Sequence, residues 1–397
     1  MLAARVTIRK RSLKHTPMST SGSPISRLSS TPAVASASQV IQLQLFDGWF
    51  AQDSETENSR TLGVWDVLPW RILSHSRGGK VPEVIVFESV RVNEGKEVTL
   101  FLTPAILRPK IIGKGLTSEP KATASAVLFP GIREELVERA LRKLAVQQTI
   151  ESRVMPDATN GSLTIEIVFS LQQLRAELER TEHGFTVEQI REALQVMHLC
   201  NVAVECPNDG FLHGKSGAIL PTLEFVRRSE DAENLSSLYR ATFHPLANAA
   251  ILGQFYHPVN YARVMKLMQP LSRWIATLLN VRFRYATRGI GKDKRSFRLT
   301  LKRILSDSGI TPEPRMRDNV ERVRAAVQEL LAAGFLDRGL RLEDFETIQF
   351  EKTRGRPKII NAEWLLYPSD RFAREILEGN TVMRNAKKPL EEKPKGV

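Results

Sequence analysis

Hydrophobic and polar positions between residues 126 and 230 switch between helical and strand-like spacing in a definite order. The pattern predicts a helix over 132–144, a strand over 163–169, helices over 171–180 and 186–199, and strands over 202–206 and 219–226. Thr186 stands three residues before Gln189, the spacing of a capping box at a helix start. A helix–turn–helix followed by a β-hairpin is typical of a winged helix, so we expect one such domain here.

The same order recurs over residues 250–370. The pattern predicts helices over 258–283, 299–306 and 317–333, followed by strands over 347–351 and 359–364. We therefore expect an α+β protein with two tandem winged-helix domains.

An internal repeat supports the duplication. Val187–Gln195 aligns without a gap with Val320–Gln328, and five of these nine positions are identical. The same register places Asn201 over Gly334, two residue types that tolerate the left-handed conformation with which helices often end. A match that agrees with the expected helix ends and following strands favours a duplicated unit over chance.

The remaining chain divides by composition. We expect a basic, disordered leader over 1–40, whose translation starts at Met1 or Met18, and a tail over 41–61. Residues 62–125 predict a β-rich segment with strands near 84–87 and 98–102, followed by a linker, and the pattern assigns this segment no role. The winged-helix domains occupy 126–230 and 250–370, and a charged, disordered tail occupies 371–397.

Charge favours nucleic acid as the partner. The net charge is +13, and the basic residues concentrate between Arg282 and Arg303 without an apolar membrane-facing helix beside them. No long apolar run predicts a membrane span, and we interpret Cys200 and Cys206 as reduced structural thiols of a cytoplasmic protein. Nucleotide, metal and nuclease motifs fail on spacing, so we expect no enzyme, no cofactor and no metal site.

The third helix of each unit is the candidate recognition helix. Arg, Asn and Gln pair with base edges in the major groove, while other basic residues grip phosphates. The candidates from the helices and the basic cluster are Gln189, Gln195, Arg295, Arg298, Lys302, Arg303, Arg315, Arg317, Asn319 and Arg322. The alternative is that these residues form solvated helix faces. The candidate recognition helix of the first domain, which is more acidic than that of the second, serves dimer contacts or scaffolding equally well.

The turn of the second wing is basic. Lys352, Arg354, Arg356 and Lys358 surround an Arg-Gly-Arg-Pro sequence that looks like an AT-hook, which lies in the narrow minor groove of A·T-rich DNA. The alternative is a basic, solvated hairpin turn.

A short apolar motif lies in the tail. Gln42, Leu43, Leu45 and Phe46 match the bacterial sliding-clamp-binding pentapeptide Gln-Leu-x-Leu-Phe, in which two apolar side chains fill a pocket and the glutamine bonds at its rim. The alternative is a hydrophobic patch that packs on its own domain.

Together, the repeated helices, the helix around Leu271 and the motif at Gln42 resemble the winged-helix plasmid replication initiators of the RepA/TrfA type. The resemblance implies binding to repeated origin sites (iterons), opening of adjacent A·T-rich DNA, recruitment of the replicative helicase and the sliding clamp, and a possible homodimer. The main rival is a winged-helix transcriptional regulator, and a weaker one is a protein-interaction scaffold.

Overall fold

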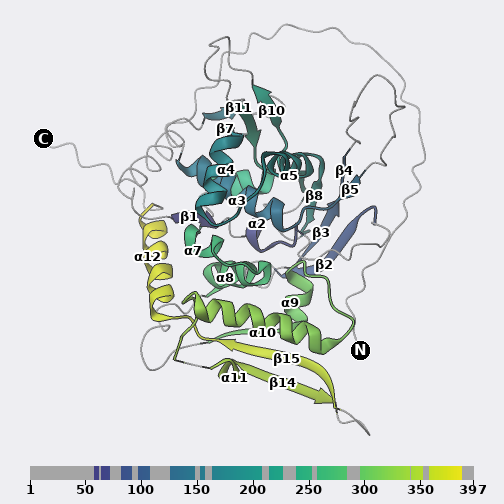
Figure 1. Cartoon of the computed structure of the whole chain (residues 1–397), viewed down its shortest axis with the longest axis vertical. Helices are drawn as coiled ribbons and strands as arrows, with labels where there is room; N and C mark the ends of the chain where they lie inside the picture. The colour runs from purple at the N-terminus through teal and green to yellow at the C-terminus, as the bar shows by residue number, and fades with distance from the viewer. Residues whose placement is uncertain are drawn as a thin grey trace, which may run out of the picture.

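Two hydrophobic cores organise the described residues, each centred on one of the predicted units. Figure 1 shows how the helices and strands around them are arranged. The computed structural model describes residues 58–61, 64–71, 82–91, 97–107, 126–147, 153–156, 163–207, 214–226, 238–252, 257–283, 296–339, 341–351 and 357–386. Among these residues no helix is both long and apolar enough to cross a lipid bilayer.

The second unit has the predicted order of elements. Its elements are α8 (Pro270–Arg282), β13 (Phe297–Thr300), α9 (Leu301–Asp307), α10 (Met316–Ala332), α11 (Leu342–Phe345), β14 (Glu346–Glu351) and β15 (Lys358–Leu366). The three strands form an antiparallel sheet in the order β13-β15-β14. Trp364 of the central strand is fully buried against the helices, because alternate residues of β15 face the core.

Local sequence sets the ends of these helices. The Thr300 hydroxyl accepts a hydrogen bond from the Arg303 amide at the start of α9. Gly334 adopts φ +74° directly after α10, which confirms the predicted left-handed stop. Asn201, its counterpart in the repeat, instead begins a strand after Cys200 in an extended conformation, so that part of the prediction is wrong.

The first unit repeats the same arrangement. It contains α3 (Ile132–Gln147), β6 (Arg153–Pro156), β7 (Leu163–Ser170), α4 (Leu171–Arg180), α5 (Val187–Leu199), β10 (Leu223–Val226) and β11 (Leu238–Thr242). Its sheet has the order β10-β11-β7-β6. The strand β11 therefore lies between β7 and β10, as β15 lies between β13 and β14. The capping boxes at Ser170 and Thr186 are both formed, and the second of these was predicted.

The predicted hairpin of the first unit is wrong. Residues 202–206 and 219–226 do not pair. Instead β8 (Asn201–Glu205) pairs with β9 (Lys215–Ala218), while β10 pairs with β11. Ile219 and Leu220 are buried between the two sheets, and Pro221 follows them where the chain crosses over. An apolar run has the same period whichever sheet it joins, so periodicity alone did not reveal the switch.

The described parts of residues 58–107 belong to both units rather than to a separate β-rich segment. Strand β1 (Asn58–Thr61) pairs with β12 (His257–Asn260) at the entrance to the second unit. Strands β2 (Ile85–Arg91) and β3 (Glu97–Thr103) extend the β8–β9 hairpin into a sheet of order β2-β3-β8-β9, and β2 packs against α9. Strand β4 (Ala105–Leu107) pairs with β5 (Ala126–Leu128) and lies beside α5.

Two further boundaries differ from the prediction. The helix expected over 258–283 is broken into β12, α7 (Tyr261–Met265) and α8, with Pro270 in the first turn of α8. The tail expected to be disordered from residue 371 begins with α12 (Asp370–Ala386), whose Phe372 packs edge-on against Phe335. The linker between the units contains α6 (Pro245–Leu252).

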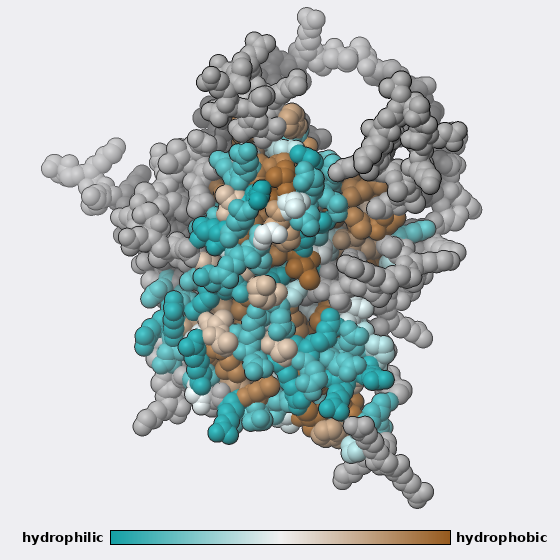
Figure 2. All heavy atoms as spheres, in the orientation of Figure 1, coloured by the Kyte–Doolittle hydropathy of each residue, from teal (hydrophilic) through white to brown (hydrophobic). Residues whose placement is uncertain are grey.

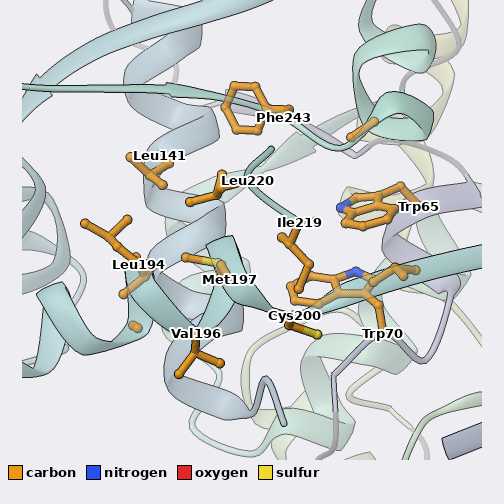
Figure 3. Packing of buried hydrophobic residues seen from close by; sticks show 14 of the residues in the cluster. Trp65, Trp70, Leu141, Leu194, Val196, Met197, Cys200, Ile219, Leu220 and Phe243 are labelled. Carbon is orange, nitrogen blue, oxygen red and sulfur yellow. The ribbon is translucent and has the colours of Figure 1, made fainter. Parts of the chain in front are cut away.

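The first core includes side chains from distant segments (Figure 3). Trp65 and Trp70 come from the segment around α2 (Val64–Val67) and stack at 5.3 Å between ring centroids. They pack in one cluster with Met197 of α5 and with Cys200. Cys200 and Cys206 are both buried free thiols, and burial raises the pKa of Cys200.

The two units join through buried charges. Glu135 of α3 lies 3.3 Å from Arg273 of α8, 3.1 Å from Arg139 and 3.4 Å from Arg71, with every one of these side chains at most 6% exposed. Burial alone would raise the pKa of Glu135, but Arg71, Arg273 and Arg139 lower it to about 2. Glu135 is therefore ionised, and its charge balances guanidinium groups from both units.

Glu329 of α10 caps α8 from outside that helix. Its carboxylate accepts hydrogen bonds from the amides of Met268 (2.5 Å) and Gln269 (3.1 Å) and from the hydroxyl of Ser272 (2.5 Å). Gln269, the residue at the N-cap, makes no side-chain cap of its own. A carboxylate at a helix start satisfies free amides and opposes the positive end of the helix dipole.

We predict that Glu329→Ala lowers the free energy of unfolding by about 1–2 kcal/mol, because the amides of Met268 and Gln269, which lead into α8, and the Ser272 hydroxyl lose their acceptor. Urea denaturation followed by tryptophan fluorescence measures the loss. Glu179→Ala is the control, because its ion pair with Arg175 is half exposed and contributes little. Equal stability of the Glu329→Ala protein and the wild type would contradict the capping role.

Candidate nucleic-acid interface

The N-terminal end of α10 carries the exposed basic residues of the second unit's candidate recognition helix. Arg315 and Arg317 are exposed, and neither pairs with an acid among the described residues. Further along the helix, Glu321, Ala325 and Gln328 are exposed at helical spacing. Hydrophilic side chains cover the surface over α9 and this end of α10 in the view of Figure 2. The free positive charge therefore lies at the start of α10 rather than along its whole length.

Asn319 was predicted to contact bases, and that prediction is wrong because the residue is 3% exposed. Its side-chain amide donates to the carbonyl oxygens of Glu313 (2.9 Å) and Arg315 (3.3 Å). Its side-chain oxygen accepts from the Glu313 amide at 2.8 Å. Asn319 thus fixes the turn that leads into α10, and its amide group is buried with its N–H donors already bonded to the backbone.

Arg322 is half-buried and also holds this turn. Its guanidinium donates to the Thr311 carbonyl and to the Glu313 carboxylate, each at 3.0 Å. Reading a base would require these bonds to break, so Arg322 is a weaker candidate than Arg315 or Arg317.

Arg324, which the prediction did not include, joins α10 to the sheet. Its guanidinium lies 2.6 Å from Glu346 at the start of β14 and 2.8 Å from Glu321. The hydrogen bonds to Glu346 raise the pKa of Arg324. The pair holds the candidate recognition helix against the base of the wing.

The predicted phosphate contacts on α9 and β13 have different surroundings. Lys302 is exposed and has no acidic partner among the described residues. Arg303 is half-buried against Asp307 at 3.4 Å and lies over the Phe297 ring. Arg298 is 69% exposed but pairs with Glu363 at 2.6 Å. Lys302 is the freest of the three to meet a phosphate.

The wing is described only at its base. Lys358 is exposed at the start of β15, and Phe350 and Ile360 are 54% and 55% exposed nearby. The other predicted contacts of the wing and basic cluster lie outside the described residues, and so do the predicted clamp-binding residues. They are Arg295, Lys352, Arg354 and Arg356, and Gln42, Leu43, Leu45 and Phe46.

The candidate recognition helix of the first unit has a different surface. Its exposed residues are Glu188, Gln189, Gln195 and Leu199, and its one arginine, Arg191, is only partly exposed. The Gln189 side-chain oxygen already accepts the Thr186 amide at 2.9 Å in the capping box. The exposed side chain of Gln195 remains available for a contact with DNA.

The prediction missed the charges that position the interface. Arg71, Glu135, Arg139 and Arg273 are buried where the units meet. The available signal was the large share of charged residues on α3, seven of its sixteen, which is unusual for a helix that leads a core.

We predict that Asn319→Ala lowers the free energy of unfolding by about 1–3 kcal/mol, because it leaves the backbone groups of Glu313 and Arg315 without their partners. Thermal unfolding monitored by circular dichroism tests this loss. Gln328→Ala, on the exposed face of the same helix, should change stability little. A similar small effect for both variants would show that Asn319 does not hold the turn.

No family model matches the chain, and no curated protein matches its sequence. Among solved structures, the chain is similar to a crystal structure of selenomethionine derivatives of domains 2 and 3 of RctB. That match has 9% identity and a TM-score of 0.43, and covers 78% of this chain and 99% of that chain. A second structure of RctB domains 2–3 matches at 10% identity with a TM-score of 0.40, covering 80% and 99%. The Pi initiator protein in complex with iteron DNA matches at 10% identity with a TM-score of 0.32, covering 59% and 94%.

Proposed function

We propose that this chain binds double-stranded DNA in a sequence-specific manner through two tandem winged-helix units, and that it is not an enzyme. The strand order β13-β15-β14, preceded by α8, α9 and α10, supports the winged-helix interpretation of the second unit. The order β10-β11-β7 in the first unit supports the duplication.

One observation carries the proposal. Arg315 and Arg317 are exposed at the N-terminal end of α10, where helix–turn–helix proteins contact base edges. Guanidinium groups make paired hydrogen bonds to guanine in the major groove, and Lys302 on the adjacent helix suits a phosphate contact. The second unit is then the main DNA reader, with Lys358 and the basic turn before it directed to the minor groove.

The first unit contributes less to DNA affinity in this proposal. The exposed face of α5 presents Glu188, and the one arginine of this helix, Arg191, is only partly exposed. An acidic side chain against a phosphate would be repelled. Its exposed Gln195 can still reach a base edge, and the rest of the face suits contacts with protein, including a second copy of the chain.

We predict that replacing both Arg315 and Arg317 with alanine weakens binding to duplex DNA and lowers the salt slope by up to about 2, if both contact phosphates. If instead they read bases, the loss is about 1–3 kcal/mol per contact, on the preferred sequence alone. Fluorescence anisotropy over a salt series, with a labelled duplex of the preferred sequence selected from a random-sequence pool and with a scrambled duplex, separates these outcomes. Replacing Arg175 and Arg374, which are exposed on other helices, controls for the same change of charge. Unchanged binding of both duplexes by the Arg315/Arg317 variant would exclude this surface.

We further propose that the DNA site is a replication origin with repeated sites, and that the protein recruits the host sliding clamp and helicase. The sequence Gln42–Phe46 supports this function over transcriptional regulation, because a repressor has no need of a sliding clamp. Transcriptional regulation remains the second candidate function. It is supported by the same observation, the exposed basic residues at the N-terminal end of α10.

We predict that the full chain retains bacterial sliding clamp in a pull-down and that replacing Leu45 and Phe46 with alanine abolishes retention, since both apolar anchors are lost. The same variant should keep DNA affinity, because its change lies outside both units. A plasmid that carries the gene with its flanking DNA and has no other origin should replicate, and the Arg315/Arg317 variant should not support it. Repression of a reporter without replication or clamp retention would favour the regulator.

A further inference from the structure

Residues 64–71, which we call the wedge, lie between the two units. Its Val67 carbonyl accepts a hydrogen bond from the Trp274 indole of α8 at 3.3 Å. Its Asp66 carboxylate accepts hydrogen bonds from both terminal nitrogens of Arg142 of α3, at 2.6 and 2.8 Å. Its Arg71 lies 3.4 Å from Glu135 of α3. The wedge thus contacts the leading helix of each unit.

The wedge also supports the turn that leads into α10. Gly309, directly after α9, adopts φ +75°, and a Cβ there would lie 2.4 Å from the Arg71 carbonyl oxygen and 3.2 Å from the Pro69 Cβ. Only the absence of a side chain lets the turn approach the wedge so closely. At the other end of this turn, the backbone of Glu313 is hydrogen-bonded to the side chain of Asn319 on α10.

The charges around the wedge hold it in one position and make displaced positions unfavourable. Four guanidinium groups and three carboxylates meet there, and each residue is at most 5% exposed: Arg71, Arg139, Arg142, Arg273, Asp66, Glu135 and Glu138. Moving the wedge out would leave buried charges without partners, which is strongly unfavourable. A partly displaced wedge is therefore unstable.

We propose that the wedge is a positioning element that sets where the N-terminal end of α10 lies relative to the first unit. The path runs from Glu135 through Arg71 to Gly309 and then along the turn to Arg315. Its consequence for DNA, a fixed spacing between the contacts of the two units, rests on the proposed function. The positioning itself does not, because it is a property of the protein alone.

Gly309→Ala tests the proposal without touching the charges. Ordinary contact begins near 3.4 Å, so a methyl group at 2.4 Å must displace the turn or the wedge by about 1 Å. Gly214→Ala is the matched control, because Gly214 has φ +71° and nothing within 4 Å of its Cβ position. Both substitutions strain the backbone similarly, and only the first acts on the wedge.

The measurement is the distance between spin labels at Gln195→Cys on α5 and Gln328→Cys on α10, both exposed, by pulsed electron paramagnetic resonance without DNA. Cys200 and Cys206 are buried, and a protein without the added cysteines measures any labelling there. We expect a narrow distribution in the parent and the Gly214→Ala protein, and a shifted, broader one in Gly309→Ala. A folded Gly309→Ala protein with the parent distribution would overturn the proposal.

A second variant covers the case in which Gly309→Ala does not fold. Trp274→Phe removes the hydrogen bond to the Val67 carbonyl while keeping an aromatic ring in the core. The distribution should again broaden, and an unchanged one in the folded variant would overturn the proposal. Random-sequence duplex DNA added to the same variants without the introduced cysteines and labels tests the functional half separately. Unchanged distance distributions with DNA binding intact reject the positioning role of the wedge. Changed distributions, with a parent protein that does not bind DNA, reject the proposed function.

Discussion

The buried carboxylate of Glu135 is the interaction on which the rest of the structure depends. It meets Arg273 of the second unit, Arg139 of its own helix and Arg71 of the segment between the units. Arg139 also donates to Thr277 of α8 at 3.2 Å. A buried charge network stabilises one arrangement mainly because every alternative leaves charges without partners. Two separate hydrophobic cores are therefore joined by a polar contact that is specific in its geometry.

This constraint explains how the candidate DNA surface is built. The turn before α10 is supported on one side by the segment that ends at Arg71 and on the other by the side chains of Asn319 and Arg322. Arg324 and Glu329 then hold α10 against the sheet and against α8. The polar residues of α10 that point inward fix its position, which leaves Arg315 and Arg317 as its free cations among the described residues.

The sequence predicted the parts of the fold that depend on local periodicity. It predicted α9, α10, β14 and β15 of the second unit, the capping box at Thr186 and the left-handed Gly334, but the helix expected over 258–283 is broken. It did not predict which strands pair, because β10 and β8 have similar patterns but join different sheets. The candidate site was harder to predict than the fold. Exposure of a polar residue on a helix depends on neighbouring turns, and Asn319 is buried by a turn that the helical pattern does not describe.

Selection of duplexes from a random-sequence pool tests the central claim most directly, namely that α10 of the second unit reads DNA sequence. Methylation of guanine N7 in the selected duplexes then reports major-groove contacts. The account predicts that the wild type enriches a defined site whose binding is blocked by methylation at particular guanines, and that replacement of Arg315 and Arg317 removes the enrichment. A wild-type protein that enriches no sequence, or a variant that enriches the same site with the same interference, would contradict it.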